Sequence, residues 1–166
     1  MRESLKRLLV EGRLGNLELG SHRDVVHDIL GEPTHWEGAG TIPYAKAMGW
    51  FYGVLEIWFE NDLAAVIRFF VGGWGERKDG NPFTPIDFFD IPRMESYPLT
   101  TFRSWLRENR IDFFEAGGSH ADIRIVKGCT ASFIWWKTWD DPEFPSGKRI
   151  HDDQMLYRVE CRVEDG

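Results

Sequence analysis

Histidine, serine and acidic side chains are the residues with which this sequence could do chemistry, and their spacing favours little of it. His22 and His27 lie five residues apart, whereas a metal pair on one helix face needs positions i and i+4. Ser119 and His120 are adjacent, so on a strand they point to opposite faces. They also lack the strand–Gly-x-Ser-x-Gly–helix context of a hydrolase. We therefore expect no metal, no cofactor and no catalytic residue; a hydrolase that uses His120 or His151 is the less favoured alternative.

Acidic side chains gather in an irregular stretch near the C-terminal end of the sequence, between residues 138 and 153. This stretch contains Asp140, Asp141, Asp152 and Asp153. Complementary charge steers association and selects partners, so such a stretch is typical of a contact patch for a basic protein. A solvated loop is the alternative interpretation.

Tryptophan is abundant, with eight residues in a chain of 166. Trp74 and Trp139 fall in irregular segments beside charged residues, which is typical of protein-binding hot spots. Aromatic side chains that pin long loops to a sheet are the alternative. The predicted partner-binding residues are Trp74, Trp139, Asp140, Asp141, Asp152 and Asp153.

Hydrophobic periodicity predicts the elements that must position these residues. Helices are expected over 3–11, over 22–30 with Ser21 as N-cap, and to about residue 109 from Thr100 or Thr101. Strands are expected over 54–60, 64–71, 121–127, 130–137 and 155–163, the first two forming a hairpin. Trp58 lies on the strand face opposite Ile57, so the sheet would carry apolar residues on both faces.

The order α-α-β-β-α-β-β-β predicts an α+β fold, an antiparallel sheet with about three helices packed on it. A length of 166 residues suits one domain, 1–166. We divide it into an N-terminal unit over about 1–71, a long loop over 72–98 and a C-terminal unit over about 99–166.

Composition excludes several classes of protein. Apolar residues make up 42% of the chain and charged residues 28%, which argues against disorder. A net charge of −7 argues against direct nucleic-acid binding, which draws on basic side chains. We expect neither a signal peptide nor a membrane span. Cys129 and Cys161 match no ligand or disulfide framework, so we expect reduced thiols and a cytoplasmic protein.

Residues 15–71 carry a pattern of short motifs. It reads Leu17-x-Leu19-Gly20, a capped helix, Leu30-Gly31-x-Pro33, a tryptophan, then Tyr52-Gly53-x-Leu55-Glu56 and a hairpin. The pattern resembles the helix-helix-hairpin unit of the SmpA/OmlA (BamE-like) and β-lactamase-inhibitor-protein-like families. It is also similar to bacterial immunity proteins of the polymorphic-toxin type. The resemblance implies a scaffold that binds other proteins and transfers no catalytic residue.

These observations predict a non-enzymatic protein-binding module. The favoured function is an immunity protein that neutralises a toxin by blocking its active site, the partner being basic, such as a nuclease or deaminase. The alternative is a small-ligand-binding or sensing domain with an aromatic-lined pocket. The sequence leaves the oligomeric state open.

Overall fold

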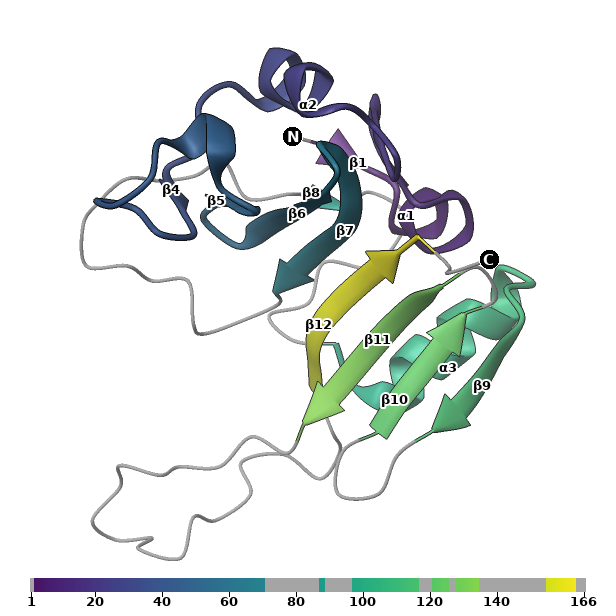
Figure 1. Ribbon diagram of the computed structural model, residues 1–166. Coiled ribbons are helices and arrows are strands. Elements are labelled where there is room, and N and C mark those ends of the chain that lie inside the picture. The colour runs from purple at the N-terminus through teal and green to yellow at the C-terminus, as the bar shows by residue number, and fades with distance from the viewer. Residues whose placement is uncertain are drawn as a thin grey trace, which may run out of the picture.

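The computed structural model describes residues 2–70, 87–88, 97–116, 121–125, 128–134 and 155–163 (Figure 1). The fold is α+β, as predicted. Its helices are α1 (Leu5–Glu11), α2 (Arg23–Leu30) and α3 (Leu99–Glu108), with a short 3-10 helix η1 (Tyr44–Lys46). The helices accompany one large antiparallel sheet and two small two-stranded sheets.

The large sheet has eight strands in the order β4-β5-β6-β7-β12-β11-β10-β9. Their bounds are β4 (His35–Trp36), β5 (Gly49–Tyr52), β6 (Leu55–Glu60), β7 (Leu63–Phe70), β9 (Phe113–Ala116), β10 (Ala121–Ile125), β11 (Cys129–Ile134) and β12 (Met155–Arg162). Pairing of β7 with β12 joins the strands of the N-terminal and C-terminal units into one continuous sheet. The small sheets pair β1 (Arg2–Glu3) with β8 (Asp87–Phe88) and β2 (Arg13–Leu14) with β3 (Leu17–Glu18).

The predicted element order is wrong in detail, because a strand comes first and seven strands were missed. Five of these, β1, β2, β3, β4 and β8, are two residues long. A two-residue strand is too short to show alternation, so only its tertiary pairing defines it. The predicted hairpin, by contrast, is confirmed as β6 and β7. Its turn residues Asn61 and Asp62 both have positive φ, as a tight two-residue turn requires.

Helix caps follow the local sequence with two corrections. Ser4 caps α1 by accepting a hydrogen bond from the N–H of Arg7. The N-cap of α2 is His22 and not Ser21, because His22 Nδ1 accepts from the N–H of Asp24 while Ser21 Oγ accepts from Glu18. The third helix begins two or three residues earlier than expected, because its N-cap is Pro98 and not Thr100 or Thr101.

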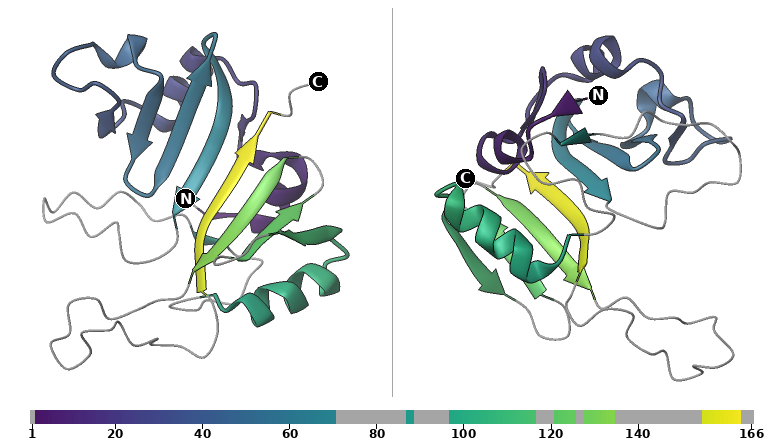
Figure 2. Two further views of the ribbon diagram at one scale, coloured as in Figure 1. Left: turned by 60° about the horizontal axis from the view of Figure 1, so that its bottom comes forward. Right: turned by 180° about the vertical axis from the view of Figure 1, so that it is seen from behind.

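All three helices contribute apolar side chains to one core on one side of the sheet. Phe102 of α3 packs against Phe133 of β11 with ring centroids 5.3 Å apart. The sheet lies in front of α3 in Figure 1, and α3 lies in front of the sheet when the molecule is seen from behind in Figure 2. Strand alternation sends Leu55 and Ile57 into this core and Glu56 to the opposite side. We call that opposite side the open face, because no helix of the described residues packs on it.

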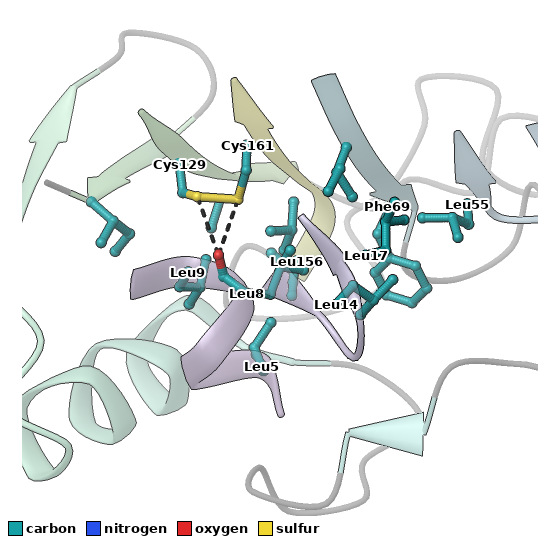
Figure 3. Packing of buried hydrophobic residues seen from close by; sticks show 14 of the residues in the cluster. Leu5, Leu8, Leu9, Leu14, Leu17, Leu55, Phe69, Cys129, Leu156 and Cys161 are labelled. Carbon is teal, nitrogen blue, oxygen red and sulfur yellow. Dashed lines mark hydrogen bonds between the residues drawn. A yellow bond between two sulfur atoms is a disulfide. The ribbon is translucent and has the colours of Figure 1, made fainter. Parts of the chain in front are cut away.

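The prediction that the cysteines are reduced thiols is wrong. Cys129 and Cys161 lie opposite each other on β11 and β12 and form a disulfide, with Cα atoms 4.0 Å apart. Both are buried beneath α1, and each sulfur atom lies 3.4 Å from the carbonyl oxygen of Leu8 (Figure 3). Sequence spacing could not reveal the pair, because the register of two strands joined by a long connection decides it. The expected cytoplasmic location therefore draws no support from the cysteines.

The described helices are short. The longest is α3, with 10 residues. None in the described part of the chain combines the length and the apolar composition that crossing a bilayer demands.

Candidate functional site

The open face carries a row of side chains that crosses the whole sheet. The strand register places one residue of each strand next to one residue of the following strand, from β4 at one edge to β9 at the other. We call this set the cross-strand row; in spatial order it consists of His35, Phe51, Glu56, Arg68, Glu160, Thr130, Arg124 and Phe114.

An ion-pair network forms the centre of the row. Arg68 donates to Glu56 over 2.9 Å and to Glu160 over 2.7 Å, and Arg162 also pairs with Glu160. The side chains of Arg68 and Glu160 are only 20% and 11% exposed. Solvent screens such a network less than a surface ion pair, so its geometry is held more firmly. The network links β6, β7 and β12.

Aromatic rings continue the face on the β4 side of this network. Phe51 lies 5.9 Å from the ring of His35 and 5.7 Å from that of Trp58. Trp58 donates its indole N–H to Glu56, and Arg68 lies over its ring. Gly49 lies beneath the indole, where a Cβ would approach the ring to 3.2 Å. The absence of a side chain at Gly49 therefore makes room for Trp58. At the β9 edge, Phe114 of the row is 54% exposed.

The pKa of Glu160 is lowered from its ordinary value near 4.5. Burial by itself would raise this pKa, but hydrogen bonds from Arg162 and Arg68, together with their positive charges, outweigh it. A carboxyl whose pKa is lower in the folded chain stabilises the fold above its unfolded pKa. That stabilisation is lost as the pH falls from about 4.5 through the lowered pKa.

Glu160→Gln is therefore expected to lower the free energy of unfolding at pH 7 by about 1–3 kcal/mol, since it removes charge-assisted hydrogen bonds. The difference from the parent protein should shrink as the pH falls below about 4.5, because the parent carboxyl then takes up a proton in the unfolded chain before it does so in the folded one. Urea unfolding from pH 3 to 7 measures this. The control is Glu11→Gln, whose exposed pair with Arg7 contributes about 0.5 kcal/mol or less. A difference that stays constant over this pH range would contradict the assignment.

A second aromatic cluster joins α2 to η1 and β5. Tyr44 stacks on His27 with centroids 6.0 Å apart and packs edge to face against Trp36 and Trp50. Both indole N–H groups donate over 2.7 Å to main-chain oxygens, that of Trp36 to Ile42 and that of Trp50 to Tyr44. These two tryptophans therefore hold the segment between β4 and β5 against the sheet. For them, the alternative interpretation applies, in which aromatic side chains pin a loop to the sheet.

A shallow pocket of about 320 Å³ lies among the described residues. It is lined by Glu3, Leu14, Gly15, Asn16 and Ile29. None of these is aromatic, so this pocket does not match the predicted aromatic-lined ligand site. Ligand pockets commonly have volumes of about 300–1,000 Å³, so this one lies at the lower limit.

The predicted partner-binding residues lie outside the described residues; they are Trp74, Trp139, Asp140, Asp141, Asp152 and Asp153. The residues that flank their segments are described. Phe70 ends β7, Ile134 ends β11 and Met155 begins β12. Because β7 and β11 both pair antiparallel with β12, these three residues lie at one end of the sheet (Figure 1). Phe70 packs there against Tyr157, with centroids 5.5 Å apart.

Three of the five histidines, His22, His27 and His35, lie in the described part of the chain. His120 and His151 lie outside it. His22 caps α2, and His27 stacks on Tyr44. Across residues 2–70 and the later described ranges, no three His, Cys, Asp or Glu side chains gather as metal ligands would.

Comparison with known proteins assigns no relative to this chain. No family model, no curated protein and no solved structure matches it. Its function must therefore be inferred from its own residues.

Sequence reasoning missed the network at the centre of the row. Arg68 and Glu160 are 92 residues apart, and the pairing of β7 with β12 was not predicted. The alternation over 155–163 does place Arg158, Glu160 and Arg162 together on one face of the strand. A partner for these charges could be named only once the neighbouring strand was known.

Proposed function

We propose that this chain is a non-enzymatic protein-binding module of the immunity type. It neutralises a basic toxin, such as a nuclease or deaminase, by blocking the toxin's active site. The observation that carries the proposal is the common departure point of the two segments with predicted contact residues. Phe70, Ile134 and Met155, the described residues that border these two segments, lie at the same end of the sheet.

Charge supports the choice of partner. The chain has a net charge of −7, and four of the six predicted contact residues are aspartates. Enzymes that act on nucleic acids bind phosphates through basic side chains. Carboxylates that enter such a site occupy the place of the phosphates, so binding and inhibition would coincide. Tryptophans beside the aspartates would supply the apolar contact area typical of interface hot spots.

The test compares two charge-matched variants. One replaces Asp140, Asp141, Asp152 and Asp153 by asparagine. The control replaces four exposed acids of the α2–β4 region, Asp24, Asp28, Glu32 and Glu37, by their amides. Both variants lose four negative charges, so long-range attraction is weakened equally.

Capture from the native host identifies the toxin, and calorimetry with the purified pair measures the affinity. We expect about a 100-fold weaker Kd for the first variant, roughly 2.7 kcal/mol, and less than a tenfold change for the control. Toxin activity should return in the same proportion as binding is lost. Equal effects of both variants, or binding that leaves the toxin active, would refute the proposal.

A further inference from the structure

We propose that the open face is the interface of a symmetric homodimer, in which a second copy of this chain packs its own open face against the first. The inference does not rest on the proposed toxin, because it concerns a different surface. It starts from the cross-strand row, whose pattern of charges and rings complements itself when reversed.

A two-fold interface requires a surface that matches its own rotated image. An axis parallel to the strands, between β7 and β12, reverses the row. Arg68 then faces Glu160 of the second copy, and Glu160 faces its Arg68. Each central charge, already paired within its own chain, thereby also lies opposite a charge of the other sign across the interface.

Next to the central pair, Glu56 faces Thr130 of the second copy, whose hydroxyl can donate to a carboxylate. Phe51 faces Arg124 of the second copy, an arrangement that favours a cation–π contact. His35 at one edge faces Phe114 at the other, so ring meets ring. An axis that runs along the row, across the strands, would instead place Arg68 against Arg68 of the second copy. Like charges in contact cost several kcal/mol. The residues therefore select one of the two possible axes.

The dimensions of the face suit a stable dimer. Eight strands about 4.8 Å apart make the row about 34 Å long. With the neighbouring rows on either side, the face covers roughly 700 Å² per copy, near the roughly 800 Å² per partner of a standard interface. Two twisted sheets pack face to face about 10 Å apart with their strands nearly aligned, which an axis along the strands permits.

The mass of the purified full chain in solution tests the dimer. Sedimentation between about 1 and 200 µM at physiological salt is expected to show twice the mass of one chain. Arg124→Glu places a carboxylate against Phe51 of the second copy and should weaken the dimer at least tenfold. Arg107→Glu is the matched control, because it makes the same charge change on α3, on the other side of the sheet. A monomer at 200 µM, or equal weakening by both variants, would overturn the proposal.

Crosslinking tests the axis. Single-cysteine additions at the two row ends, His35→Cys and Phe114→Cys, are mixed and treated with a bismaleimide of about 15 Å reach. The proposed axis joins unlike ends, so we expect crosslinked dimers in the mixture and none in either protein alone. Crosslinking within each protein alone would show the other axis and overturn the assignment.

Discussion

Arg23→Ala is expected to lower the free energy of unfolding by about 3 kcal/mol, the largest effect of any single charged side chain that we consider. Arg23 is buried at the start of α2, where it donates to the carbonyl oxygen of Ala47 over 2.7 Å and to Asp62 over 3.0 Å. Its guanidinium lies over the rings of Phe59 and Trp50. Alanine leaves a buried carbonyl without its donor and removes the contact with both rings.

Thermal and urea unfolding measure this loss. For a chain of this size, 3 kcal/mol corresponds to a fall in Tm of roughly 6–12 °C. Asp62→Asn removes the ion pair alone and leaves the hydrogen bond to Ala47 and the ring contacts of Arg23 in place. Asp62 is 63% exposed, so loss of the ion pair should cost about 1 kcal/mol or less. Arg13→Ala removes an exposed pair with Glu18 and serves as the matched arginine control. An Arg23→Ala effect no larger than that of Arg13→Ala would show that Arg23 does not hold α2 to the sheet.

Removing the disulfide should destabilise the protein by a similar or larger amount. Cys129 and Cys161 are separated by 32 residues, and closing a loop of that length in the unfolded chain is worth about 3–4 kcal/mol. The double variant Cys129→Ala/Cys161→Ala should therefore unfold at a lower urea concentration than the oxidised parent. The parent unfolded in the presence of a reductant should approach the stability of the variant.

Thiol titration provides the independent check. The chain has two cysteines, so protein denatured without reductant should react with no thiol reagent, and reduced protein should react at two positions. A reductant should leave the double variant unchanged. Two reactive thiols in oxidised, denatured protein would contradict the disulfide. Both sulfurs are buried beneath α1, so reduction should be slow until the fold opens.

Local sequence predicted the elements whose signals are local. Ser4 and Gly12 mark the ends of α1, and Leu5, Leu8 and Leu9 share its buried stripe. The hairpin of β6 and β7 was predictable because apolar and polar residues alternate on both sides of a two-residue turn. The short strands β4 and β8 escaped prediction, since two residues carry no period and acquire their structure from their neighbours.

The open face was likewise predictable only in part from the sequence. Alternation within β6 placed Glu56 and Trp58 opposite the core, so a second, partly polar face was predictable. The ion pairs on that face were not predictable. Arg68 and Glu160 are 92 residues apart and meet only because β7 pairs with β12.

Sequence alone thus determined the α+β class, the three helices, the central hairpin and the acidic character of the chain, because these depend on nearest neighbours and composition. Only the tertiary structure decided the sheet order, the pairing of Cys129 with Cys161 and the cross-strand row. Each of these depends on the register of strands far apart in the chain. A shift of one residue would send every side chain of a strand to the other face, and nothing in the strand's own residues specifies its distant neighbour.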